Sequence, residues 1–235
     1  MPKPAVSPPN GSPPPNGARK RAKAMPRAER RDQLLAAAGR IVVDGGIGAL
    51  TMEALAEAAG VSKPVVYEHW DNSESVAVAL LDAYFKAAVE AVDTAARDAA
   101  TLGEYLSLAV DAQFEFHKRD RLSPWGITNG YSSSERLNNA YRQLRRITLE
   151  TFEDLLTQQG VEPQLAAAAG FVLAAMMNST VYEYAPRPDN LIAREALKAM
   201  MNGALSAIVP LQEARPRTPE RTLETYRRLN GLQED

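Results

Sequence analysis

The sequence predicts an all-α fold, and three observations lead to this prediction. Apolar residues recur every three or four positions over long segments, which is the spacing of one helix face. Between these segments lie glycines, prolines and short polar residues of the kinds that begin and end helices. No segment alternates apolar and polar residues in the manner of a strand, and no hairpin turn signal stands out. We therefore expect a small N-terminal three-helix domain followed by a larger helical domain.

The first 26 residues differ from the rest of the chain. They hold half of the sixteen prolines and end in the basic cluster Arg19–Lys23, so a disordered basic arm is expected over 1–26. Residues 1–31 contain eight basic residues and one acidic residue, a charge of +7. With a net charge of −2, the remainder of the chain carries −9. A basic end on an acidic body suggests contact with a polyanion, although a solubilising tail has the same composition.

Three helices are expected in the N-terminal domain. The first begins near Arg27, carries an apolar stripe through Leu34, Ala38 and Ile41, and stops at Gly45–Gly46. Thr51 is a suitable N-cap for a short second helix that Gly60 ends. Ser62 is expected to cap the third helix, in whose first turn Pro64 is tolerated.

The larger domain is expected to begin with a long helix that Asp71–Asn72 caps. It would run from about Ser73 to Ala96. Caps and breakers then divide the rest into further helices near 101–117, 134–159, 163–184 and 190–211, an irregular segment at 120–132 and a short helix at 219–229.

The segment Thr51–Trp70 has the pattern of a helix-turn-helix. The first helix would bury Leu55 and Ala56, and the second would bury Val66 and Trp70. The residues left outside are Lys63, Pro64, Val65, Tyr67 and His69. Such a face suits the DNA major groove, since a lysine can contact phosphate or guanine and small apolar groups can contact a thymine methyl. An ordinary helical hairpin with a polar face has the same bare pattern.

More specific motifs make residues 28–88 resemble the DNA-binding domain of the TetR family. The matching segments are Gly45–Gly48, Leu50–Met52, Ala54–Lys63, Val66–Tyr67 and His69–Trp70, followed by Glu74. Three positions depart from the family pattern. Trp70 stands where phenylalanine is usual, Ser73 where a lysine is common, and Pro64 where a small residue is common; the last puts the base preference in doubt.

The resemblance implies a domain order and a DNA-binding set. Residues 27–72 would form the DNA-binding domain, 73–215 a ligand-binding and dimerisation domain, and 216–235 a C-terminal tail. Thr51, Tyr67 and His69 would hold phosphates, and Lys63, Pro64 and Val65 would face bases. The full expected set of DNA-binding residues is Thr51, Met52, Ser62, Lys63, Pro64, Val65, Tyr67 and His69.

The resemblance also implies a ligand-responsive repressor. The helices at 163–184 and 190–211 would pair with those of a second copy, so the homodimer would bind a palindromic operator on double-stranded DNA. A small apolar or amphipathic effector would release it. The expected ligand-binding residues are aromatic and methionine side chains, which also fill ordinary cores. They are Phe114, Trp125, Tyr131, Met176 and Met177.

Composition argues against several other classes. The chain has no cysteine and only two histidines, His69 and His117, and no catalytic or metal-ligand spacing, so no enzyme, cofactor or metal is expected. The longest nearly apolar run, Leu165–Met177, has 13 residues, too short to span a bilayer, and a cytoplasmic protein is expected. An all-helical enzyme, and a binding protein that keeps the fold without DNA affinity, remain as alternatives.

Overall fold

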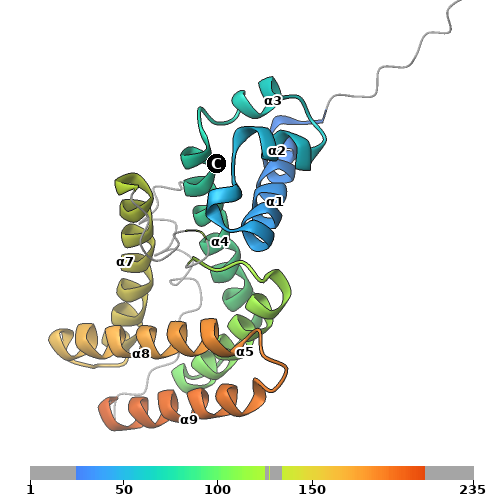
Figure 1. Ribbon diagram of the computed structural model, residues 1–235. Helices are drawn as coiled ribbons and strands as arrows, with labels where there is room; N and C mark the ends of the chain where they lie inside the picture. Colours follow the sequence, from blue (N-terminus) through green and yellow to red (C-terminus); the bar gives the residue numbers. More distant parts are fainter. Residues whose placement is uncertain (1–24, 125–126, 128–133, 210–235) are drawn as a thin grey trace, which may run out of the picture.

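The computed structural model describes residues 25–124, 127 and 134–209, and every regular element within them is a helix. The predicted all-α class is thus confirmed. Helices α1–α3 surround the beginning of α4 at one end of the molecule, and α8 and α9 run side by side at the other (Figure 1). The elements are α1 (Arg27–Gly45), a short 3-10 turn (Ile47–Ala49), α2 (Met52–Ala59), α3 (Lys63–Tyr67), α4 (Ser73–Ala96), α5 (Leu102–Asp120), α7 (Glu135–Gln158), α8 (Pro163–Tyr184) and α9 (Leu191–Ile208).

Most of the predicted helix boundaries are confirmed, because the expected caps are formed. Thr51 Oγ1 accepts a hydrogen bond from Ala54 N at 3.0 Å, and Asn72 Oδ1 accepts one from Ser75 N at 2.9 Å. Ser62 occupies the predicted N-cap position of α3 with an extended backbone, but its side chain accepts no such bond. The basic arm up to residue 24 and the helix expected at 219–229 lie outside the described residues.

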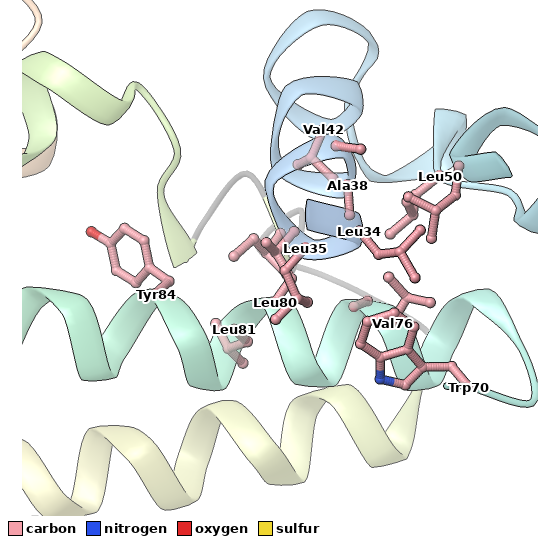
Figure 2. Packing of buried hydrophobic residues seen from close by; sticks show 14 of the residues in the cluster. Leu34, Leu35, Ala38, Val42, Leu50, Trp70, Val76, Leu80, Leu81 and Tyr84 are labelled. Carbon is pink, nitrogen blue, oxygen red and sulfur yellow. The ribbon is translucent and has the colours of Figure 1, made fainter. Parts of the chain in front are cut away.

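The first of two cores joins the N-terminal helices to α4. Leu34, Leu55, Val66 and Leu81 are completely buried in it. Trp70 is 7% exposed and fills the position below α3, with the Arg31 guanidinium 5.0 Å from its ring centre. Figure 2 labels Leu34, Leu81 and Trp70 among the buried side chains around α1 and α4. The substitution of tryptophan for the family's usual phenylalanine is therefore accommodated in the core.

The second core lies among α5, α7, α8 and α9. Phe114, Leu106, Leu156 and Met201 are its most deeply buried side chains. The C-terminal part of α4 enters this core through Val92 and Ala96, among others. Helix α4 therefore belongs to both cores and connects them mechanically.

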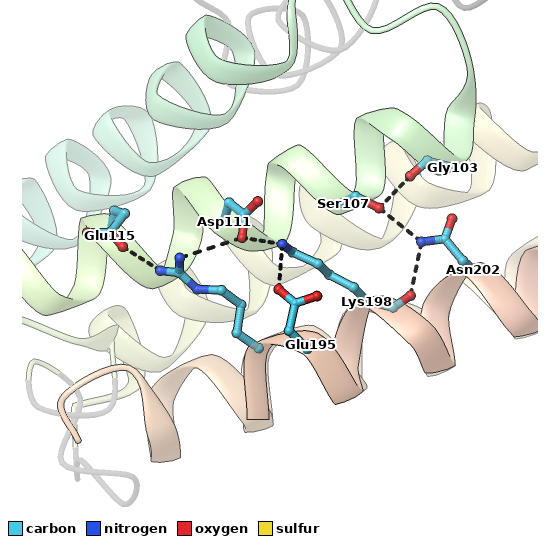
Figure 3. Close-up of polar contacts among 8 residues, drawn as sticks. Gly103, Ser107, Asp111, Glu115, Glu195, Lys198 and Asn202 are labelled. Carbon is cyan, nitrogen blue, oxygen red and sulfur yellow. Dashed lines mark hydrogen bonds and ion pairs between the residues drawn. The ribbon is translucent and has the colours of Figure 1, made fainter. Parts of the chain in front are cut away.

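Charged side chains fix α9 against α5. Arg194 pairs with Glu115 and, at 3.7 Å, with Asp111; Lys198 contacts Asp111 at 2.6 Å and Glu195 at 3.0 Å. Figure 3 shows this ladder between the two helices. The Arg194 guanidinium lowers the pKa of the Glu115 carboxyl, which keeps the pair ionised.

Helix α8 requires a correction of the sequence analysis. Its 22 residues contain a window with mean hydropathy 1.5, so by length and composition it could cross a membrane. The nearly apolar run counted from the sequence ends before the polar Asn178, although the helix continues and its mean hydropathy stays high. A single such helix is weak evidence for a membrane, and α8 packs against α7 along its length.

Candidate functional site

Helices α2 and α3 form a tight corner at Gly60. This residue has the left-handed backbone conformation, with φ of 66°, and Val61 N donates to Ala56 O at 3.0 Å. The corner directs Val66 into the core and leaves the opposite face of α3 outside. Lys63, Pro64 and Tyr67 are exposed there, Tyr67 by 50%, while Val65 and His69 are half-buried.

The predicted DNA-binding set is not uniformly accessible. Thr51 and Ser62 are exposed. Met52 is 6% exposed and packs in the first core, so its side chain faces away from solvent. Residues on one face of α2 point inward with Leu55, and the helical spacing already placed Met52 on that face. Any contact by Met52 is limited to its backbone N–H.

An ion pair that the sequence analysis did not predict connects α2 to α3. Lys63 Nζ lies 2.6 Å from Glu53 Oε1, and both side chains are more than half exposed. The hydrogen bond from Lys63 lowers the pKa of the Glu53 carboxyl. In the free protein, the carboxylate of Glu53 therefore compensates the positive charge of Lys63, the expected base or phosphate contact.

Three arginines from the start of α1 lie near the end of α3. Arg27 Nη2 donates to Glu68 O at 3.2 Å, and Arg31 stacks over Trp70. Partial burial, together with the charges of Arg27, Arg31 and Arg30, lowers the pKa of His69. The exposed face of α3 is thus flanked by a cationic cluster, and His69 is held in its neutral form near neutral pH.

A second site is a cavity among α4, α5, α7 and α8. It holds about 840 Å³ of empty space, part of it open to solvent. None of the described residues that line it is charged. We call it the apolar cavity. Its lining is Tyr84, Phe85, Ala88, Val89, Val92, Tyr105, Leu106, Ala109, Gln113, Leu144, Ile147, Thr148, Thr151, Phe152, Leu155, Met177, Asn178 and Tyr182.

A directional hydrogen-bond network centred on His117 lies next to Tyr84 and Gln113, which line the apolar cavity. His117 Nδ1 lies 2.8 Å from the carbonyl of Gln113 and must donate to it, so in the neutral ring Nε2 accepts from the Tyr84 hydroxyl. Tyr182 lies edge-on to the His117 ring, with 4.9 Å between the two ring centres. Burial raises the pKa of the Tyr182 phenol, which keeps it a hydrogen-bond donor.

The predicted ligand-binding residues are dispersed. Met177 lines the apolar cavity. Phe114 is fully buried in the second core under Arg194, and Met176 packs against that core; neither lines the cavity. Trp125 and Tyr131 lie outside the described residues. The cavity residues of α7 were not predicted, although Leu144, Ile147, Thr148 and Thr151 recur at helical spacing on one face.

Bacterial transcriptional regulators match part of the chain in sequence. Residues 34–80 match the profile of the bacterial regulatory proteins of the tetR family. The HTH-type transcriptional activator FasR from Mycolicibacterium smegmatis is 39% identical over 106 residues, or 45% of this chain and 48% of FasR. The chain thus spans about half the length of that relative.

Solved structures share the fold over most of the chain. A TetR-family regulator from Streptomyces coelicolor, SCO4454, superposes with a TM-score of 0.67 at 19% identity, covering 78% of this chain and 97% of that one. FadR from Bacillus subtilis, solved in complex with stearoyl-CoA, gives a TM-score of 0.61 at 18% identity, covering 74% of this chain and 98% of FadR. At these identities, the likeness establishes the fold.

Proposed function

Since the chain belongs to the TetR family and is a DNA-binding transcriptional regulator, we propose that it acts as a homodimeric, effector-responsive repressor in the cytoplasm. The operator is a palindrome on double-stranded DNA, read by two copies of α3. A small apolar or amphipathic effector releases the protein from this operator. FasR is named an activator, so a promoter–reporter assay with and without the gene decides the direction of regulation.

The exposed face of α3 carries the DNA-binding proposal. Arg27 and Arg31 of α1 flank this face, and it follows the corner at Gly60 as the face of a recognition helix does. Phosphate contacts come from Thr51, Tyr67 and His69, and Lys63 and its neighbours face the bases.

The dimer proposal depends on apolar side chains that α8 and α9 leave exposed. Phe171 is 49% exposed, Val172 52%, Ile192 81% and Met200 61%. Apolar groups gathered on neighbouring helices are typical of surfaces that a partner covers. Small residues beside them, such as Gly203, whose Cβ position is open, permit close approach of a second copy.

The effector proposal depends on the apolar cavity. Its uncharged lining favours an apolar group, and FadR from B. subtilis has been solved with stearoyl-CoA. Because α4 lines this cavity and also packs in the first core, a ligand there acts on the helix that carries the DNA-binding domain. Coupling of about 1–3 kcal/mol would lower DNA affinity roughly 5- to 150-fold.

Fluorescence anisotropy with the DNA upstream of the protein's own gene tests this function. Lys63→Ala should weaken binding and reduce the slope of log K against log salt by about one, because one phosphate or base contact is lost. Lys118→Ala removes an exposed lysine of α5, outside the helix-turn-helix, and serves as the control. Equal binding by wild type and Lys63→Ala would refute the assignment, and no binding at any salt would indicate a protein that keeps the fold without DNA affinity.

A further inference from the structure

The apolar cavity has an outer neighbour. Between α7 and α8 lies a second cavity, with about 620 Å³ of empty space that is partly open to solvent. Three residues, Thr148, Asn178 and Tyr182, line both cavities. The two spaces therefore share one wall, and that wall is made of uncharged hydrogen-bonding side chains. We call the second space the outer cavity.

Charge separates the two cavities. Arg145, on α7, is the one charged side chain among the described residues that line either of them. It is exposed, its guanidinium lies 5.7 Å from the ring centre of Phe171, and it forms no ion pair with any described residue. Four other described arginines of the second domain form ion pairs with carboxylates, namely Arg97, Arg146, Arg187 and Arg194.

This distribution limits where each part of a ligand can lie. A charged group inside the apolar cavity would lose its hydration without gaining a counter-ion, at a cost of several kcal/mol. At Arg145 the same group remains partly hydrated and gains charge-assisted hydrogen bonds from a planar fork of N–H donors. Thr148, Asn178 and Tyr182 can accept or donate hydrogen bonds to a neutral polar linkage between the two.

We propose that the effector is an anionic amphiphile, with its apolar chain in the apolar cavity and its carboxylate or phosphate at Arg145. The inference rests on the proposed effector function and adds the charge of the ligand and the residue that binds it. The Thr148–Asn178–Tyr182 wall lies between the two ends of the bound molecule. A neutral amphiphile of equal chain length is then a weaker ligand.

Calorimetry with three ten-carbon probes tests the proposal: decanoate, decyl phosphate and decanol, each below its micellar concentration. Wild-type protein should bind one or both anions about tenfold more tightly than decanol. Arg145→Gln should abolish this preference while leaving the affinity for decanol unchanged, and Arg145→Lys should restore part of it. The two anions distinguish a carboxylate site from a phosphate site.

Arg142→Gln is the matched control. Arg142 lies one turn earlier on the same helix, is exposed, contacts Asn138 and Asn139, and lines neither cavity. Equal affinity for decanol and both anions, or an equal loss of anion preference in Arg142→Gln and Arg145→Gln, would overturn the proposal while the effector function stands. Absence of binding by all three probes would overturn both. Circular dichroism of each variant excludes unfolding as the cause.

Discussion

Glu53 restrains the lysine on which DNA contact depends. The carboxylate lies 2.6 Å from Lys63 Nζ on the face that would approach DNA, so it competes with phosphate for the same cation. A protein that must find one operator among many other sequences gains from weak nonspecific binding, because phosphate contacts carry no sequence information. The ion pair thus favours discrimination between the operator and other DNA sequences over high affinity for any duplex.

Glu53→Gln should therefore raise the affinity for a random duplex by about threefold or more, since Lys63 is freed and one repulsive charge is removed. Anisotropy at several salt concentrations measures this change. Glu57→Gln is the control, because Glu57 is also exposed on α2 but forms no ion pair with a described residue. A similar gain from both variants would mean that net charge alone is responsible.

His69 should make DNA binding depend on pH. In the free protein, burial and the neighbouring arginines lower its pKa, so the imidazole is neutral near neutral pH. A phosphate at its side favours the protonated form, so binding takes up a proton and affinity should rise as pH falls from about 8 to 6. His69→Gln should flatten this dependence. An unchanged pH profile in the variant would place the titrating group elsewhere.

At the residue scale, side-chain roles were only partly predictable from the sequence. The outward face of α3 follows from helical spacing, which is a local property. Met52 was assigned to DNA by resemblance although its spacing places it inward, and Glu53 was overlooked because its partner is ten residues away, across a turn. The Tyr84–His117–Tyr182 network joins three helices, and such distant contacts are not encoded in local periodicity.

At the scale of elements, prediction succeeded because helix ends are set locally. The long helix from Ser73 to Ala96 and the helix from Pro163 to Tyr184 end where predicted, since caps, glycines and prolines act within a few residues. Which helices pack together was not predictable in this way. The close contact between α7 and α8 depends on Gly170, where a Cβ would lie 3.1 Å from Glu153 N and 3.2 Å from Phe152 Cβ.

Gly170→Ala should destabilise the fold by about 1–3 kcal/mol, because a methyl group there forces the two helices apart. Thermal unfolding followed by circular dichroism measures the change. Gly39→Ala is the matched control in α1, where the new Cβ would lie at an ordinary 3.8 Å from Leu80 Cδ1. That variant should stabilise the protein by about 0.5–1 kcal/mol through reduced backbone entropy. Equal effects at the two sites would contradict the packing argument.

At the scale of the whole molecule, the exposed apolar side chains of α8 and α9 predict the assembly. Met200→Glu should convert the dimer to a monomer in sedimentation velocity, because a charge would be buried without a partner. The monomer should also lose affinity for a palindromic site while a half-site is bound as before. Gln143→Glu, on the exposed side of α7, should leave both properties unchanged. A wild-type protein that sediments as a monomer would refute the dimer.

Helix α4 carries a geometric consequence of its membership in both cores. Its 24 residues form a rod about 36 Å long, rigid on the scale of a side-chain displacement. Pivoting such a rod by about 5° at the cavity end swings its far tip by roughly 3 Å, close to the axial step between neighbouring base pairs. A DNA-binding domain carried on that tip would be displaced by about one base-pair step, while Tyr84, about 18 Å from a pivot at Ala96, would move by only about 1.6 Å.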